Sequence, residues 1–332
     1  MAPEKLFEIA RRTFDTPEFR GMEFIEVEAK TVINKVPGGS LPFDWTINPY
    51  RGCSHACTYC FARPTHTFLD MDAGRDFETR IVVKVNAAEV LRRQLAAPRW
   101  KGEHIAMGTG TDPYQRAEGR YRLMPPIVEA LTDYRNPFSI LTKGTLILRD
   151  IDLLVKAAAV TSVGAAFSIG TLDEDAWRRT EPGTPHPRAR MEAVRALNDA
   201  GVPTGVLMAP ILPGITDKPR LLRQVVEAAI EARATYLSPI LLHLRPGVRE
   251  EFLPWLAREY PDLVSRYQEL YPKAYATGGA RKELGRRVSS IVRAMGGLDP
   301  GVSGPAHAEP PRFQRPAPVR RTAEAPTQLR LV

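Results

Sequence analysis

The chain has 332 residues, of which 43% are hydrophobic and 25% are charged, and its formal net charge is +8. This composition is typical of a globular protein that is long enough to bury one large core or two smaller ones. No stretch resembles a transmembrane helix, and Glu4, Lys5 and Glu8 stand where a signal peptide would need an apolar segment. We therefore expect a cytoplasmic protein with no membrane partner.

Residues 1–44 are expected to form an N-terminal extension, and from Trp45 onward short apolar runs alternate with helical segments. Asn86 is placed to cap one of the predicted helices, and Glu89 follows it three residues later. Several predicted strands are apolar on both faces, which is typical of strands in a parallel sheet covered by helices. The predicted strands are 43–50, 80–85, 104–112, 138–144, 162–171, 202–214 and 234–244, and the predicted helices are 86–95, 125–134, 149–159, 187–201 and 218–232.

The repeated strand–helix units predict an α/β domain over residues 45–245, either a βα barrel or an open doubly wound sheet. In both architectures, the loops at the carboxyl ends of the strands form the functional site. We therefore expect the segment after the first strand and the loops at 108–118, 142–145, 168–177 and 210–217 to converge.

The C-terminal part of the chain changes character twice. Residues 246–296 predict a helical extension that packs on the α/β domain, and residues 297–332, rich in Pro, Ala and Arg, predict a disordered tail. Between Lys273 and Met295, six basic residues stand against the single acid Glu283, a local excess of +5. This excess indicates either a solvated basic face or a surface that contacts phosphates. The basic residues are Lys273, Arg281, Lys282, Arg286, Arg287 and Arg293.

All three cysteines of the chain, Cys53, Cys57 and Cys60, fall within eight positions. Cysteine thiolates are soft ligands that suit iron–sulfur clusters and zinc. A four-iron cluster normally takes four cysteines, so three would leave one iron open to a substrate. The alternatives are a zinc site completed by His55 or His66, and three thiols that bind nothing. The clustering favours the iron–sulfur interpretation.

The stretch "CSHACTYC", with Tyr59 as its aromatic residue, matches the Cys-x3-Cys-x-aromatic-Cys signature of the radical S-adenosylmethionine (SAM) enzymes. Further stretches, among them "GTGTDPYQRAE", "LTKGTLILRDIDLL" and "LHLRPGVREEFLPWL", resemble the subgroup related to spore photoproduct lyase. The resemblance covers roughly residues 30–275. It implies a partial (βα)6 TIM-type barrel, a [4Fe-4S] cluster on the three cysteines, and SAM on the open iron. One-electron cleavage of SAM would then produce a 5′-deoxyadenosyl radical that abstracts hydrogen from the substrate.

The resemblance also implies roles for the other loops. The loop at 108–111 would lie at the methionine end of SAM, where the family usually has a Gly-Gly-Glu-like element and this chain has a variant. Lys143 would approach the SAM carboxylate, Ser168 the ribose, and the loop at 210–214 the adenine. The plainer interpretations are a solvent-facing lysine, a serine bonded to backbone and a proline-rich turn. The implied cofactor-binding residues are Tyr59, Gly108, Thr109, Gly110, Thr111, Lys143, Ser168, Pro210 and Ile211.

Three residues near these loops are candidates for catalysis or substrate contact: Asp112, Tyr114 and Glu181. A turn, core packing and a surface acid are the respective alternatives. Spore photoproduct lyase uses an additional cysteine as hydrogen donor, and this chain has none beyond its three. The expected function is a radical SAM reaction on a nucleic-acid lesion, with flavodoxin or ferredoxin as reductant and DNA or RNA as partner. The alternatives are a radical SAM reaction on a peptide or small molecule, and a non-catalytic zinc-binding nucleic-acid protein.

Overall fold

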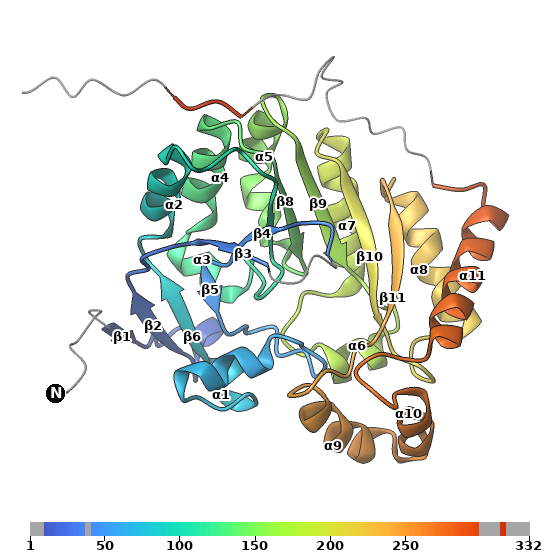
Figure 1. Cartoon of the computed structure of the whole chain (residues 1–332). Coiled ribbons are helices and arrows are strands. Elements are labelled where there is room, and N and C mark those ends of the chain that lie inside the picture. The colour runs from blue at the N-terminus through green and yellow to red at the C-terminus, as the bar shows by residue number, and fades with distance from the viewer. Residues whose placement is uncertain (1–9, 37–40, 299–312, 317–332) are drawn as a thin grey trace, which may run out of the picture.

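The structure is a computed structural model that describes residues 10–36, 41–298 and 313–316. Its main element is a curved seven-stranded sheet with the strand order β11-β10-β9-β8-β7-β4-β3 (Figure 1). Neighbouring strands from β4 to β11 are parallel, and β3 is antiparallel to β4. These strands are β3 (Ile33–Lys35), β4 (Trp45–Ile47), β7 (Ile105–Met107), β8 (Phe138–Thr142), β9 (Val163–Ser168), β10 (Thr204–Ile211) and β11 (Leu237–Leu241).

Helices connect the parallel strands and cover the sheet. Strands β7 and β9 are buried almost throughout, because helices cover one of their faces and the other faces the interior of the curved sheet. Strands β3 and β11 form the two ends of the sheet and do not pair, so the six parallel strands form the expected partial barrel rather than a closed one. The connecting elements are α2 (Ala87–Ala96), α3 (Arg116–Tyr121), α4 (Met124–Asp133), η3 (Thr145–Asp150), α5 (Ile151–Ala158), α6 (Glu174–Thr180), α7 (Pro187–Asp199) and α8 (Pro219–Glu231).

A second, four-stranded sheet with the order β1-β2-β6-β5 lies beside the barrel. The predicted strand at 80–85 forms β6 of this sheet and is not one of the barrel strands. It pairs with β5, which ends at Arg51. Residues 53–60, which hold the three cysteines and are called the cysteine segment below, follow directly, so this sheet anchors the start of that segment. Its strands and neighbours are β1 (Ala10–Arg12), η1 (Pro17–Phe19), β2 (Glu23–Val27), β5 (Tyr50–Arg51), η2 (Arg63–Leu69), α1 (Arg75–Thr79) and β6 (Arg80–Lys84).

The chain after β11 forms helices α9 (Arg249–Glu259), η4 (Pro261–Leu263), α10 (Val264–Leu270) and α11 (Gly278–Ala294). Helix α11 packs against β11 and α8 at the edge of the barrel. Most of the predicted disordered tail lies outside the described residues, but residues 313–316 lie against the body of the protein. There the ring of Phe313 stacks on Tyr134 with their centroids 6.3 Å apart. No helix within the described ranges is long and apolar enough to cross a membrane.

Candidate functional site

The cysteine segment follows β4 at the carboxyl end of the parallel strands. Gly52 has a φ of +83°, and a Cβ at this position would lie 2.8 Å from the imidazole of His66 and 3.0 Å from the carbonyl oxygen of Phe77. A glycine is therefore needed where the chain turns into the segment. Beyond it, Cys53 and Cys57 are buried and Cys60 is partly exposed, and all three are free thiols.

Buried side chains hold the backbone of this segment. The amide of Gln115 spans Cys53, donating to the carbonyl oxygen of Gly52 at 2.8 Å and accepting from the backbone N–H of Ser54 at 3.0 Å. The guanidinium of Arg63 donates to the carbonyl oxygen of Cys57 through both Nε and Nη2, at 3.1 and 2.9 Å. The backbone is thus preorganised around Cys53 and at Cys57 by side chains that are themselves buried.

The three thiols are close enough to influence one another's pKa. Burial raises the pKa of each thiol, and that of Cys57 reaches about 12 although the nearby ammonium of Lys143 acts to lower it. The negative charges that Cys57 and Cys60 would carry as thiolates further raise the pKa of Cys53. The thiols are therefore protonated near neutral pH, and a bound metal must displace their protons.

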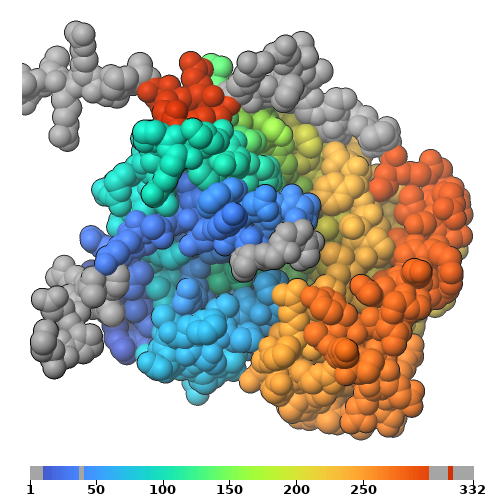
Figure 2. All heavy atoms as spheres, in the orientation of Figure 1, coloured from blue at the N-terminus to red at the C-terminus, as the bar shows by residue number. Residues whose placement is uncertain are grey.

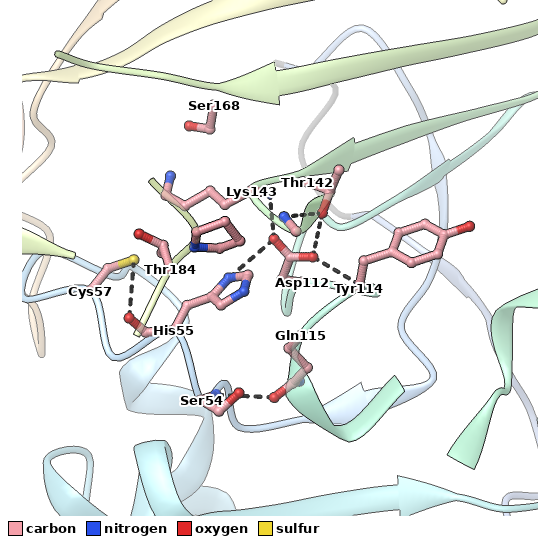
Figure 3. A network of polar contacts seen from close by, with 12 residues as sticks. Ser54, His55, Cys57, Asp112, Tyr114, Gln115, Thr142, Lys143, Ser168 and Thr184 are labelled. Atoms are coloured by element: carbon pink, nitrogen blue, oxygen red, sulfur yellow. Dashed lines mark hydrogen bonds and ion pairs between the residues drawn. The ribbon is translucent and has the colours of Figure 1, made fainter. Parts of the chain in front are cut away.

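Asp112 ties three loops together (Figure 3). Its Oδ1 accepts from the hydroxyl of Thr142 at 2.6 Å, and its Oδ2 accepts from the backbone N–H of Lys143 at 2.6 Å and lies 3.3 Å from Nδ1 of His55. Burial alone would raise the pKa of Asp112, but His55, Thr142 and the Lys143 N–H together lower it. Because both carboxylate oxygens are engaged within the protein, we assign Asp112 to positioning the cysteine segment against the loop after β8.

Tyr114, the second candidate, is not brought to the site. Its side chain is buried, and its ring points away from Cys57 (Figure 3). A Cβ at Gly144 would lie 2.2 Å from the carbonyl oxygen of Tyr114, so the loop after β8 packs directly on this residue. Tyr114 therefore serves the core, as the alternative interpretation had it.

Glu181, the third candidate, lies at the centre of a buried ionic network. It accepts hydrogen bonds from the phenol of Tyr59 and, at 2.5 Å, from Nη2 of Arg190, and Nζ of Lys143 lies 3.7 Å from its Oε1. Burial alone would raise the pKa of Glu181, but Arg190 and Lys143 together lower it to about 2. The network joins the cysteine segment to the loop after β8 and to helix α7, and its charges lie next to Cys57.

The glycine–threonine loop at 108–111 leaves β7 beside the cysteine segment. Gly108 has a φ of +82°, and a Cβ there would lie 1.8 Å from the carbonyl oxygen of Leu141. The side chain of Asn48 accepts from the backbone N–H of Gly110 at 3.0 Å. The hydroxyl of Thr109 contacts that of Thr46 at 2.6 Å, and the hydroxyl of Thr111 donates to a backbone carbonyl of β5 at 2.7 Å. These contacts place the loop at the predicted edge of the sheet.

The remaining predicted cofactor residues lie on β9 and β10. The hydroxyl of Ser168 donates to the carbonyl oxygen of Ala209 at 2.8 Å, which is the backbone contact of the plainer interpretation. A Cβ at Gly170 would lie 2.4 Å from the carbonyl oxygen of Pro210, so this glycine lets the two loops approach. Pro210 is partly exposed, whereas Ile211 is fully buried. Of this pair, only Pro210 exposes part of its surface in the structure.

Each of the two histidines near the cysteines has one ring nitrogen engaged elsewhere, and the buried Nδ1 of His66 has no hydrogen-bond partner among the described residues. Nδ1 of His55 lies against Asp112, and Nε2 of His66 lies 3.0 Å from the carbonyl oxygen of Arg80. In the part of the chain that the structure describes, no three His, Cys, Asp or Glu side chains are close enough to hold a single metal ion. The thiolates of an iron–sulfur cluster bind separate irons, so they need not meet at one point. The donor set of three free thiols, two of them buried, fits such a cluster.

Sequence reasoning missed Asn48, Gln115 and Arg190. A signal existed for Arg190, because it shares the inward face of α7 with Pro187 and Val194, and its side chain is 1% exposed. An arginine in the apolar stripe of a helix requires a buried partner. Asn48 and Gln115 gave no such signal, since each acts through residues about sixty positions away.

Comparison with known proteins places this geometry in a family. Residues 47–225, more than half of the chain, match the Radical SAM superfamily. An uncharacterized protein of Mycobacterium tuberculosis (strain ATCC 25618 / H37Rv) is 48% identical over 283 residues, which cover 85% of this chain and 83% of that protein.

Two structures of spore photoproduct lyase share the fold. A mutant of that enzyme gives a TM-score of 0.61 at 16% identity, covering 84% of this chain and 80% of the other. A mutant with bound AdoMet and dinucleoside spore photoproduct gives 0.58 at 14% identity, covering 81% and 77%. The chain belongs to the radical SAM superfamily, whose enzymes use S-adenosylmethionine and an iron–sulfur cluster.

Proposed function

We propose that this enzyme holds a [4Fe-4S] cluster on Cys53, Cys57 and Cys60 and uses SAM to abstract a hydrogen atom from a nucleic-acid lesion. The observation that carries the cluster assignment is the set of three free thiols in one eight-residue segment, at the carboxyl end of a parallel sheet. Three cysteine ligands leave one iron for SAM, and both nearby histidines have other partners.

The residues around the cysteines would bind SAM and orient it. When bound, a reduced cluster would supply the one electron that cleaves the sulfonium of SAM, and the 5′-deoxyadenosyl radical so formed would take a hydrogen atom from the substrate. Nζ of Lys143 lies 3.7 Å from Oε1 of Glu181 and 5.7 Å from the centroid of the Tyr59 ring, and an ammonium with three N–H donors can serve the SAM carboxylate as well. The positive charges of Lys143 and Arg190 next to Cys57 favour its thiolate form.

The substrate proposal rests on two observations. The net charge of +8 favours an anionic partner, and the fold is shared with spore photoproduct lyase, a structure of which contains a dinucleoside lesion. The chain has no cysteine outside the metal-binding segment. We therefore propose that a tyrosine or SAM itself returns hydrogen to the substrate radical, and that a flavodoxin or ferredoxin supplies the electron. Modification of a peptide or small molecule is the second candidate, favoured by this absence of a donor cysteine.

The test is anaerobic reconstitution of the full chain followed by metal analysis and SAM cleavage. We expect brown protein with about four irons that releases 5′-deoxyadenosine on reduction. Replacing any one of Cys53, Cys57 or Cys60 with Ala should abolish SAM cleavage and reduce the iron content. The control His55→Ala should leave the iron content nearly unchanged. Colourless wild-type protein with a single zinc, or loss of the metal in His55→Ala, would contradict the proposal.

A further inference from the structure

The loop after β11 and the segment before α11 form a cationic and aromatic cluster. His243 and Tyr275 form an isolated antiparallel bridge, and their rings meet edge to face with centroids 4.7 Å apart. The guanidinium of Arg245 donates to the hydroxyl of Tyr275 at 2.6 Å and lies 5.5 Å from the centroid of its ring. Figure 1 shows these two segments, which link β11 to α9 and α10 to α11, running side by side.

The cations of this cluster lack counterions among the described residues. Arg245 and Arg281 make no ion pair with any carboxylate that the structure describes, and the nearby Glu250 accepts instead from the backbone N–H of Gly247 at 2.5 Å. Burial lowers the pKa of His243, and the charges of Arg245 and Arg281 lower it further. Two unneutralised arginines therefore act on the same ring.

Two other arginines of the basic C-terminal region have partners of their own. Arg286 pairs with Glu283, and Arg287 donates to the carbonyl oxygen of Asp217 at 2.6 Å. The local excess of +5 read from the sequence is thus not one uniform surface. In the cluster, by contrast, the guanidinium of Arg245 lies against the ring of Tyr275, and the charge of Arg281, at the start of α11, acts on His243.

This cluster adjoins the cysteine segment. A Cβ at Gly247 would lie 2.2 Å from the ring of Pro64, so the loop after β11 rests directly on helix η2, which begins three residues after Cys60. Two phenylalanines flank that contact in sequence and are open to solvent, Phe61 at 54% and Phe68 at 81%. In Figure 2 the orange C-terminal atoms meet the light-blue atoms of the cysteine side on one face.

We propose that His243, Arg245, Tyr275 and Arg281 bind the phosphate backbone of a single-stranded or locally unpaired nucleic acid and lead it to the cysteine site. Unpaired arginines interleaved with exposed aromatic rings suit phosphates and unstacked bases together. Chemistry on a base at the end of a curved sheet requires that the base leave its duplex, which favours a single strand over a paired one. An acidic polypeptide would use the charges but not the rings. The inference deepens the proposed function and rests on it for the identity of the substrate.

The test measures binding separately from catalysis. Fluorescence anisotropy of a labelled oligothymidylate of about 12 nucleotides follows binding to the reconstituted full chain between about 50 and 200 mM salt. For Arg245→Ala/Arg281→Ala, we expect the slope of log K against log salt to become shallower by about 1.4, with at least about tenfold weaker binding at low salt. Tyr275→Ala should weaken binding with little change in slope.

Two further variants keep the result interpretable. Arg245→Lys/Arg281→Lys preserves both charges and should retain the slope of the wild type. Arg195→Ala/Arg223→Ala removes two arginines from the outer helices α7 and α8, and should bind as the wild type does. Equal losses in this control and in the cluster variant would overturn the proposal, as would tighter binding of polyglutamate than of the oligonucleotide. Absence of salt-dependent binding in a chain that still cleaves SAM would remove this surface and the nucleic-acid substrate but leave the SAM chemistry, whereas binding without SAM cleavage would remove the SAM chemistry and leave the surface.

Discussion

Glu181 is the residue that holds the buried ionic network of the site together. Its partners come from three parts of the chain: Tyr59 from the cysteine segment, Lys143 from the loop after β8, and Arg190 from α7. Arg190 is only 1% exposed, and its guanidinium also donates to the hydroxyl of Thr184 at 2.7 Å. A charge buried to this extent is tolerated because it is paired and hydrogen-bonded.

Replacing Glu181 with Gln should therefore destabilise the protein strongly. The change leaves the buried guanidinium of Arg190 without its opposite charge, and we expect a loss of about 3–5 kcal/mol in the free energy of unfolding. Urea denaturation at neutral pH measures it. The control Glu174→Gln alters an exposed carboxylate that pairs with Arg178, where about 0.5 kcal/mol or less is expected. Similar losses in both variants would contradict the role given to Glu181.

The same carboxylate predicts a pH dependence. Its pKa is lowered in the folded state to about 2 from its ordinary value of 4.5, so the unfolded chain binds its proton first as the pH falls. The resulting stabilisation, on the order of 3 kcal/mol, is present above about pH 4.5 and is lost between there and pH 2. In Glu181→Gln, the free energy of unfolding should fall less steeply over this range.

Among the elements, the cysteine segment depends on a glycine that is distant in sequence. The backbone N–H of Gly183 donates to the carbonyl oxygen of His55 at 3.1 Å, and a Cβ on Gly183 would lie 2.1 Å from the carbonyl oxygen of Ser54. The segment after α6 therefore supports the cysteine segment by close backbone contact. Any side chain at position 183 would therefore displace either the segment after α6 or the cysteine segment.

Gly183→Ala should consequently destabilise the protein by about 1–3 kcal/mol through overpacking and lower the iron content after reconstitution. Gly285→Ala provides the matched control. Gly285 lies within α11, and a Cβ added there would meet no atom within 4 Å, so alanine should stabilise the helix by about 0.5–1 kcal/mol. Thermal unfolding and iron analysis of both variants decide the matter, and normal iron content in Gly183→Ala would contradict the close contact.

The predicted helices and strands differ from the observed ones in a few details. The six strands of the barrel and five of the helices that cover it were predicted because each is a local pattern of apolar residues, whereas the short helices α3 and α6 were missed. The assignment of residues 80–85 to the same series was wrong, because strand pairing joins β6 to β2 and β5. Asn86 stands at the N-cap position of α2, as expected, but its side chain accepts from the backbone N–H of Ala29 at 2.8 Å and makes no capping hydrogen bond to the helix.

At the scale of the whole molecule, a short C-terminal stretch returns to the body of the protein far from the cysteines. The backbone N–H of Gln314 donates to the carbonyl oxygen of Tyr134 at 3.0 Å, and Nη2 of Arg315 donates to that of Trp100 at 2.8 Å. Gly102, with a φ of +82°, leaves the space into which Phe313 packs. This stretch covers the loops that lead into β7 and β8, opposite the site.

Truncation tests this contact. Removing residues 299–332 should lower the free energy of unfolding by about 1–2 kcal/mol, because the apolar surface under Phe313 becomes exposed. Removing only residues 317–332 keeps the contact and should leave stability unchanged. Neither truncation should alter the iron content, because the cysteines lie at the other end of the barrel. Equal stability of the two truncated chains would show that the contact contributes nothing.

The sequence by itself determined the cluster of cysteines and the alternation of strands and helices, because both are encoded in short stretches: three thiols within eight positions and apolar runs at a regular spacing. Only the tertiary structure decided which polar groups meet. Asp112 and His55 are 57 positions apart and Tyr59 and Glu181 are 122 apart, and no local pattern carries such pairings. The strand order brings them together at one edge of the sheet, where burial strengthens each contact and makes each unpaired group costly.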